Sequence, residues 1–398
     1  MKNILRLCAA ALVILTQSTW AQVQDYQRWS IPESARPNQE TLEFYLKRYL
    51  DDPKKFAQLS VPPAANASVF NRNLREEPRV SQALKNTALL SYMLYENGEI
   101  TVDKINPRFA VDNQTKFYSM SVGKSITAYV LAHAVCMNMV EGLDHRLSDW
   151  PLLSGTLYQN VSLIDLVNMR AGDQQVVAKN QGLVQSGRNP NNSSILSMVR
   201  RELKDTTPDS PYFNYNEISP NIVLNYIIYR SNGRFDELMN KIFREKIGTE
   251  QSVFFLKQAQ GQEADGLART TFYATRHDYL RIARAMLMDW QADTCEGGFL
   301  KEVYSRRQAK QGNQMQYTNP NGSFWAFRGY GGFFHTDYYD FKKDRNIIYM
   351  SGYGGQMIVI DLDQGRIVST HAVHNDFDWK GLVSDVIGLG KFKKYFWN

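Results

Sequence analysis

The sequence predicts a protein of the α/β (α+β) class, with one antiparallel sheet built from strands near both ends of the chain and flanked by helices. A hairpin pattern surrounds Asn97-Gly98, and short β-rich runs follow Ser323, whereas helical patterns fill most of the sequence between them. We therefore expect a large all-α insertion at about residues 141–310. The 398 residues, 43% of them hydrophobic, suffice for a substantial core, and no internal repeat is visible.

Residues 1–21 are typical of a secretory signal. Lys2 and Arg6 precede an apolar run at 7–15, and Thr19-Trp20-Ala21 places small residues at the usual cleavage positions. The apolar run is shorter than the roughly 20 residues of a membrane span, and no other segment is long and uncharged enough to cross a bilayer. We expect a periplasmic or secreted protein without a membrane span.

The mature chain begins with a predicted N-terminal extension at residues 22–85, followed by the main domain at 86–398. The extension contains an expected amphipathic helix at 38–50, whose apolar face is formed by Leu42, Tyr45, Leu46 and Tyr49. The main domain begins with strands at 87–95 and 99–104. They form a hairpin because Asn and Gly tolerate positive φ in the turn between them.

The stretch from Phe117 to Val140 joins a polar cluster to a long apolar run and predicts a central helix, closed by Gly142. Ser121 and Lys124 are three residues apart, so they share a face of this helix, with the serine in its first turn. The positive end of the helix dipole favours negative charge on the serine oxygen. Burial should lower the pKa of Lys124 and let it act as a base near neutral pH.

The remaining helices and strands follow from caps, turns and hydrophobic periodicity. Helices are expected at 162–168, 193–203, 219–230, 234–246, 276–290 and 378–389, with Ser162, Ser219 and Thr275 as caps. Strands are expected at 325–335, 346–351, 356–362 and 366–371. These positions place strands at the end of the chain and helices in its middle.

Charge and residue usage make several kinds of partner and cofactor improbable. Loss of Lys2 and Arg6 with the signal leaves 44 basic residues against 40 acidic ones, and this mild excess is scattered, so we expect no nucleic-acid binding. The histidines and cysteines show no metal-ligand spacing, and we predict no metal and no cofactor. Cys136 and Cys295 remain after signal removal. An exported protein could pair them, but Cys136 is equally well read as a small core residue.

Three motifs compete for the stretch around Ser121. A phosphate-binding loop at Gly123-Lys124-Ser125 needs a glycine where the chain has Tyr118. A nucleophile elbow needs a glycine where the chain has Ser119, and its fold needs alternating strands and helices. Ser-x-x-Lys at the head of an apolar helix remains. Alone it is weak, because a capping serine and a lysine with a buried stem produce the same spacing.

Further motifs follow in order along the chain. They read TALLSYMLYENGEITVDKI, FYSMSVGKS, VSLIDLVNMRAG, FNYNEISPNIVLNYII and YMSGYGGQMIVIDLDQGRIV. From Thr87 to the C-terminus the sequence resembles the serine β-lactamase and penicillin-binding-protein superfamily. It is most similar to the class C β-lactamase-like group, which includes DD-peptidases, family VIII-type esterases and 6-aminohexanoate-dimer hydrolases. The resemblance implies the β-lactamase/DD-peptidase-like fold, with Ser121 as acylated nucleophile, Lys124 as its base partner and Tyr215 as the tyrosine of the second motif.

Acyl transfer by this set of residues is chemically reasonable. A Lys–Tyr pair can take the serine proton and later give it to the leaving group, and no histidine is required. The resemblance also implies that the backbone N–H groups of Ser121 and Tyr353 stabilise the tetrahedral intermediate. Gly352 and Gly354 flank Tyr353 and would let a substrate approach the backbone, although a tight bend between strands would explain them equally well.

The sequence departs from the family pattern at two places. The second motif commonly reads Tyr-x-Asn, whereas Tyr215 is followed by Asn216 and then Glu217. The third motif commonly begins with Lys or His, but Met350 stands at that position. A cation there would hold a substrate carboxylate, so its absence argues against efficient β-lactam hydrolysis unless Arg328 or another basic residue reaches in.

The expected function is that of an exported serine hydrolase that cleaves a small ester or amide through an acyl-enzyme. Two alternatives remain: a β-lactamase or DD-carboxypeptidase acting on β-lactams or cell-wall peptides, and a non-catalytic binder of cell-wall peptides with the same fold. In the second case Ser121 and Lys124 would be a cap and a core residue, and Tyr215 an aromatic packing residue. The sequence leaves the acyl group, the leaving group and the oligomeric state open.

Overall fold

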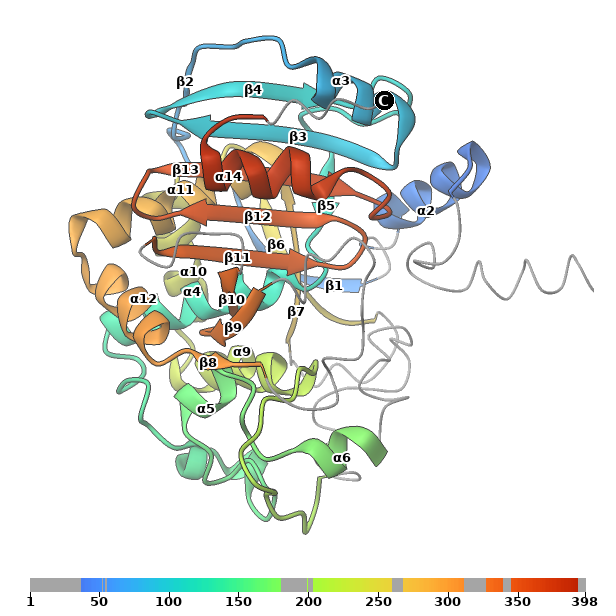
Figure 1. The fold of residues 1–398 in the computed structure, drawn as a ribbon. Helices are drawn as coiled ribbons and strands as arrows, with labels where there is room; N and C mark the ends of the chain where they lie inside the picture. Colours follow the sequence, from blue (N-terminus) through green and yellow to red (C-terminus); the bar gives the residue numbers. More distant parts are fainter. Residues whose placement is uncertain are drawn as a thin grey trace, which may run out of the picture.

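The computed structural model describes residues 37–51, 53, 56–179, 199, 203–259, 268–310, 327–338 and 345–392. The predicted signal at 1–21 lies outside this part of the chain, as does most of the helix expected at 193–203. Strands of the described part form a large and a small sheet, and helices cover both sheets (Figure 1). None of the helices in these ranges combines the length and the apolar character needed to cross a membrane.

The main sheet has nine strands and joins the two ends of the chain, as predicted. Its order is β2 (Asn71–Arg72), β4 (Glu99–Ile105), β3 (Leu89–Glu96), β13 (Arg366–Ala372), β12 (Gln356–Asp361), β11 (Ile347–Gly352), β10 (Phe334–Tyr338), β9 (Phe327–Gly331) and β8 (Gln308–Ala309). Neighbours are antiparallel except β2 and β4. Asn97 and Gly98 have the positive φ values, 53° and 83°, that the predicted hairpin requires.

The strand predicted at 325–335 is in fact two strands within the described residues. β9 and β10 are joined by a turn in which Gly332 and Phe333 both have φ of 62°. Phe333 in this turn is itself buried, so the hydrophobic pattern of the sequence shows no break between the two strands. Periodicity alone therefore did not reveal the reversal.

The prediction that residues 141–310 are all helical is wrong. β6 (Val253–Ala259) and β7 (Ala268–Thr275) lie in this segment and pair with β1 (Phe56–Val61) and β5 (Lys116–Tyr118) in a small sheet of order β1-β6-β7-β5. The apolar run at the start of β6 is too short for its periodicity to distinguish a strand from a buried helix. Its pairing partners come from distant parts of the chain, which local reading does not detect.

The helices largely follow the expected order. They are α2 (Gln39–Asp51), α3 (Pro78–Asn86), α4 (Val122–Cys136), α5 (Leu163–Val167), α6 (Gln174–Lys179), α9 (Ile218–Arg230), α10 (Phe235–Asn240), α11 (Arg276–Ala292), α12 (Cys295–Ser305) and α14 (Asp385–Leu389). π-Helical turns at Lys241–Lys246 and Lys380–Ser384 continue α10 and precede α14. The side chains of Ser162 and Thr275 accept the predicted capping hydrogen bonds from the amides of Asp165 and Asp278.

Two predicted helix boundaries are wrong, and a short strand precedes the central helix. The segment from Lys116 to Tyr118 is strand β5, because it pairs with β7 before the chain turns into α4. α4 ends at Cys136 and not at Gly142, since Asn138 takes the left-handed conformation, with φ of 53°. Glu217, not Ser219, is the N-cap of α9, so the serine lies inside the helix.

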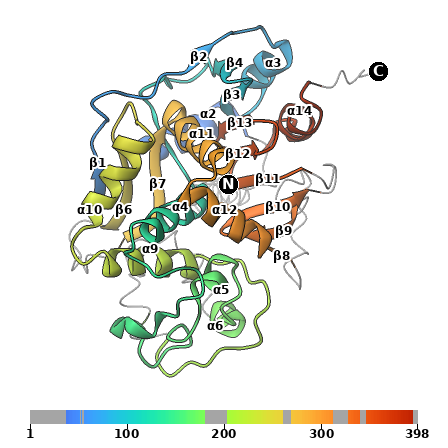
Figure 2. The ribbon, with the colours of Figure 1, turned by 90° about the vertical axis from the view of Figure 1, so that its left-hand side faces the viewer.

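Helix α4 lies at the centre of the molecule, between the two sheets (Figure 2). It contacts β7 of the small sheet, β11 and β12 of the main sheet, and helices α9, α10 and α12. Every residue from Val122 to Ala134 is buried, which agrees with the largely apolar sequence after Lys124. The opposite face of the main sheet forms a second core with α3 and α14.

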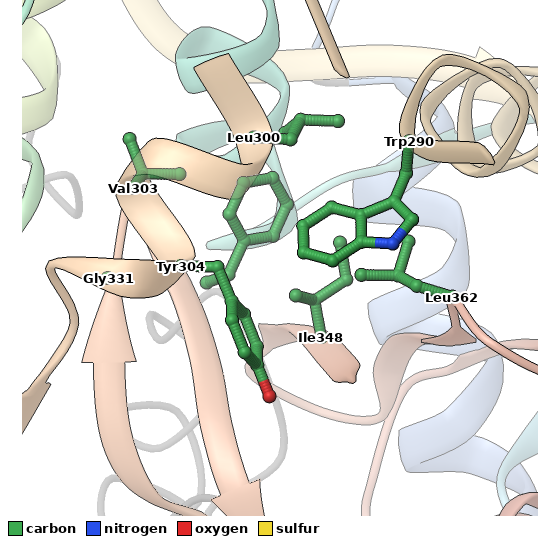
Figure 3. Close-up of a pocket in the computed structure, with 8 residues that line it drawn as sticks. Trp290, Leu300, Val303, Tyr304, Gly331, Ile348 and Leu362 are labelled. Carbon is green, nitrogen blue, oxygen red and sulfur yellow. The ribbon is translucent and has the colours of Figure 1, made fainter. Parts of the chain in front are cut away.

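Two features hold α12 against α4 and the main sheet. A disulfide joins Cys136 at the end of α4 to Cys295 at the start of α12, and so settles the pairing that the sequence left open. Trp290 of α11 and three residues of α12 also enclose a narrow apolar hollow against the main sheet (Figure 3). Its other lining residues are apolar residues and Gly331. We therefore regard the hollow as part of the core.

Candidate active site

Ser121 lies at a sharp turn between β5 and α4. Ser119 continues the pairing of β5 with β7, because its N–H donates to the carbonyl of Phe272 and its Oγ accepts from the N–H of Phe272, both at 2.9 Å. Met120 then takes a left-handed conformation, with φ of 47°, and Ser121 becomes the N-cap of α4. Its side chain makes no capping hydrogen bond. The serine hydroxyl is thus presented to Lys124, and the alternative of a simple capping serine does not fit.

The structure brings together the three residues predicted to be catalytic. The Lys124 Nζ donates to the Ser121 Oγ over 2.7 Å. The Tyr215 hydroxyl is hydrogen-bonded to both Ser121 and Lys124, and the Lys124 Nζ lies 4.8 Å from the centre of the Tyr215 ring. The Lys124 side chain is only 2% exposed. Nucleophile, amine and phenol therefore form one hydrogen-bonded cluster at the start of α4.

Glu217 is a fourth member of this cluster, and the sequence analysis did not assign it a role. Its carboxylate forms an ion pair with Lys124, and the Glu217 side chain remains 41% exposed. Glu217 occupies the third position of the Tyr-x-Asn pattern. The appearance of an acid there, noted only as a departure from the pattern, was the signal that could have identified it.

Asn216 points away from the cluster. Its Nδ2 donates to a carboxylate oxygen of Asp173 over 3.1 Å. Its Oδ1 accepts from the backbone N–H groups of Ile218 and Ser219, at 2.8 and 2.9 Å. It therefore satisfies free amides at the start of α9 and helps to fix the tyrosine loop.

The prediction of a lowered pKa for Lys124 is wrong. Burial does act to lower the pKa of this amine, but the adjacent Glu217 carboxylate and the Tyr215 hydroxyl outweigh it, and the pKa lies above its ordinary value. Burial raises the pKa of Tyr215, an effect that the Lys124 charge only partly offsets. At neutral pH the resting site therefore contains an ammonium and a neutral phenol.

A buried carboxylate holds the loop that carries Tyr215. Asp173 accepts hydrogen bonds from the Tyr158 hydroxyl at 2.6 Å, the Asn214 Nδ2 at 2.8 Å and the Asn216 Nδ2 at 3.1 Å. Burial raises the pKa of Asp173 despite these donors. The two asparagines flank Tyr215 in sequence, so Asp173 fixes the chain on both sides of the tyrosine.

The end of β11 lies against the turn that carries Ser121. A Cβ on Gly352 would come within 2.6 Å of the Ser119 carbonyl oxygen and 3.0 Å of the Met120 Cβ. Tyr353 is exposed next to this contact, and Gly354 follows with φ of 77°. Gly352 is therefore required by the close approach of two backbone segments, and Gly354 by a turn. The two segments that would supply the oxyanion donors are neighbours.

Met350 is completely buried in the core on the α4 side of β11 and provides no cation. Arg328 is exposed on β9. The structure places another basic pair nearer to Tyr215: the Lys310 Nζ lies 2.7 Å from the His335 Nδ1, and the His335 ring is centred 6.2 Å from the Tyr215 ring. Burial lowers the pKa of both groups well below their ordinary values. This pair thus favours uncharged forms and is a weak substitute for the missing cation.

No group of three or more His, Cys, Asp or Glu side chains in the described part of the chain could hold a metal ion. The chemistry of the cluster is that of proton transfer to and from a hydroxyl. It can generate a serine nucleophile and can return a proton to a leaving group.

Comparison with known proteins identifies the fold and the family of the chain. The family model described as Beta-lactamase matches residues 80–380. No curated protein matches the sequence. A protein from Bacillus anthracis assigned as a 6-aminohexanoate-dimer hydrolase has a similar structure, with a TM-score of 0.66 and 13% identity over 90% of this chain and 100% of that one.

Two amide-cleaving enzymes are also similar in structure. For a D-stereospecific amidohydrolase from Streptomyces sp., the TM-score is 0.53 and the identity 13%, over 80% of this chain and 100% of the other. For a D-amino acid amidase from Ochrobactrum anthropi, the values are 0.52 and 15%, over 78% and 95%. At such identities the likeness shows the fold, and the predicted fold and superfamily are confirmed. The chain belongs to the Beta-lactamase family, whose members share this fold and are mostly serine hydrolases.

Proposed function

We propose that this protein is an exported serine hydrolase that cleaves a small ester or amide through an acyl-enzyme on Ser121. One observation carries the proposal: the Lys124 Nζ lies 2.7 Å from the Ser121 Oγ, and Tyr215 is hydrogen-bonded to both. A serine that makes no capping bond and contacts an ammonium and a phenol is arranged for proton transfer and not for helix capping alone.

The proposed reaction has two stages. The Ser121 hydroxyl passes its proton into the hydrogen-bonded cluster around Lys124 as its oxygen attacks the carbonyl carbon of the substrate, and the N–H groups of Ser121 and Tyr353 stabilise the oxyanion. The tetrahedral intermediate then expels the alcohol or amine, which takes this proton back from the cluster through Lys124. In the second stage water attacks the ester carbon, the bond from this carbon to the Ser121 Oγ breaks, and a proton from the water returns to Oγ through the cluster as the acid leaves. The position of β11 beside the Ser119–Met120 turn supports the assignment of Tyr353.

The charges around the site support a substrate without a carboxylate beside the scissile bond. Met350 removes a cation, and Glu217 adds an anion close to Ser121. A carboxylate-bearing substrate would lose a charge-assisted hydrogen bond worth about 1.5–3 kcal/mol, roughly a 10- to 150-fold handicap. The names of the amidohydrolase and the amidase support amides alongside esters.

Export is part of the proposal and rests on the sequence of residues 1–21. The disulfide between Cys136 and Cys295 supports it, because such bonds persist in oxidising compartments such as the periplasm and are rare in the cytosol.

A fluorophosphonate probe tests the nucleophile. We expect the wild type to be labelled, Ser121→Ala to be unlabelled, and Ser305→Ala, which changes an exposed serine at the end of α12, to behave like the wild type. A folded wild type that takes up no label would instead favour a binder of cell-wall peptides.

Substrate class is tested by comparing kcat/KM for p-nitrophenyl esters and for a chromogenic cephalosporin. We expect the ester to be preferred by a factor of roughly 10 to 150. A wild type that prefers the cephalosporin would favour the β-lactamase alternative and refute the argument from Met350.

A further inference from the structure

The ammonium of Lys124 is fully engaged in the resting site. A lysine ammonium has three N–H donors and no acceptor. The structure gives it three acceptors: the Ser121 Oγ, the Tyr215 hydroxyl and the Glu217 carboxylate. Lys124 therefore donates to the nucleophile and has no lone pair with which to remove the serine proton. Some other group must finally hold that proton.

We propose that Glu217 is the acceptor of the proton that leaves Ser121, and that Lys124 relays it. This inference rests on the proposed acyl-enzyme function and assigns the proton path within the same site. Glu217 is the anionic member of the cluster and contacts Lys124 directly, whereas Tyr215 is held as a neutral phenol. Transfer to a carboxylate cancels two opposite charges in a partly buried site, which lowers the cost of moving the proton.

The step balances in protons and electrons. As the Ser121 Oγ forms its bond to the acyl carbon, its proton passes to the Lys124 Nζ, and one Nζ–H proton passes to Glu217. The carbonyl π electrons move to the oxyanion. When the intermediate collapses, the bond from carbon to the leaving group breaks, and the proton returns from Glu217 through Lys124 to the alcohol oxygen or amine nitrogen. Lys124 carries the same charge before and after.

The other titratable groups that face the Lys124–Glu217 pair do not change charge around pH 7, so they do not shape the pH dependence of the acylation rate there. Phenols face the pair from three segments: Tyr118 of β5, Tyr215 of the loop before α9, and Tyr330 of β9. Burial raises the pKa of each above 10, so they stay neutral around pH 7. Arg269 of β7 acts on Tyr118 as a fixed positive charge. On the far side of Tyr215, burial keeps His335 uncharged.

A rival role for Glu217 gives the opposite prediction. If Glu217 served only to keep Lys124 protonated, it would inhibit the reaction, because a neutral Lys124 is a better base. Removal of the carboxylate would then let burial lower the pKa of Lys124 and would raise the rate at neutral pH. The proposal predicts a loss at neutral pH. The sign of the effect therefore separates the two roles.

The test measures the rate of Ser121 phosphonylation by a fluorophosphonate and of its acylation by a p-nitrophenyl ester, from about pH 4 to about pH 10, for the wild type, Glu217→Gln, Glu217→Asn and Glu217→Asp. The wild-type rate should rise along an acidic limb and stay level through neutral pH. Glu217→Gln and Glu217→Asn should be at least roughly 100-fold slower at pH 7, with rates that climb about tenfold per pH unit toward alkaline pH as Lys124 loses its proton. Glu217→Asp should recover part of the rate and the acidic limb.

Two controls keep the result interpretable. Glu237→Gln removes an exposed acid from the first turn of α10 and should leave rate and pH profile unchanged. Thermal unfolding of each variant shows that it is folded at the assay temperature. Wild-type-like or faster acylation by Glu217→Gln, with an unchanged acidic limb, overturns the inference while the serine hydrolase assignment stands. Absence of labelling in the wild type would instead refute the proposed function itself.

Discussion

Replacement of Asp173 by alanine should damage both stability and catalysis, although Asp173 contacts neither Ser121 nor Lys124 through any hydrogen bond that the described residues show. Its carboxylate accepts from Tyr158, Asn214 and Asn216, and all four side chains are buried. Asp173→Ala leaves these three donors without their acceptor, at about 1–3 kcal/mol each, and also removes the longer bond of 3.5 Å from the buried Ser219 hydroxyl. Water entering the space vacated by the carboxylate would satisfy some of them. We therefore expect the free energy of unfolding to fall by about 3–6 kcal/mol.

The catalytic loss should be separable from the loss of stability. Tyr215 lies between the two asparagines that Asp173 holds, so their release lets the phenol shift relative to Ser121. A misplacement of about 1 Å costs roughly 100-fold in rate. Urea unfolding followed by circular dichroism measures the first effect, and fluorophosphonate labelling of the folded variant at low temperature measures the second. Asp236→Ala, at an exposed position on α10, is the control. Stability within about 1 kcal/mol of the wild type together with an unchanged labelling rate would refute the reasoning.

Two further predictions concern α4. Lys124→Arg should keep the charge beside Glu217 but reduce acylation by at least roughly 100-fold, because a guanidinium does not give up its proton; near-normal labelling of the folded variant would contradict the role of Lys124. Gly123→Ala should destabilise the protein by about 3 kcal/mol or more in urea unfolding, because its Cβ would lie 1.8 Å from the Thr270 carbonyl oxygen; an unfolding midpoint equal to that of the wild type would show that β7 can move aside at little cost.

The sequence predicted those parts of the fold whose signals are local. Asn97-Gly98 marked the hairpin, and the apolar residues after Lys124 marked the central helix, because turn chemistry and periodicity act within a few residues. Strands β6 and β7 were missed because their identity depends on partners at β1 and β5, far away in the chain. The same limit applies to Asp173, which meets Asn214 across 41 residues.

The site shows the same division between local and distant information. Ser121 and Lys124 share a face because of their spacing, and this was predictable. The direction of the Lys124 pKa shift was not. Burial followed from the apolar sequence around the lysine, but the stronger opposing influence comes from Glu217, 93 residues further along the chain. Desolvation can be inferred from neighbours in sequence, whereas a charge partner must be found in space.

The two departures from the family pattern act in the same direction on the charge of the site. Met350 replaces a cation by a neutral side chain, and Glu217 replaces a neutral amide by an anion, so each makes the site one unit more negative than the common pattern. Glu217 is held against Lys124, and the pair together is neutral. We propose that such a site binds a substrate carboxylate weakly but provides a path for the proton that leaves Ser121. In our proposal, the acid at position 217 therefore bears on both substrate choice and mechanism: it disfavours anionic substrates and supplies the carboxylate to which the serine proton moves.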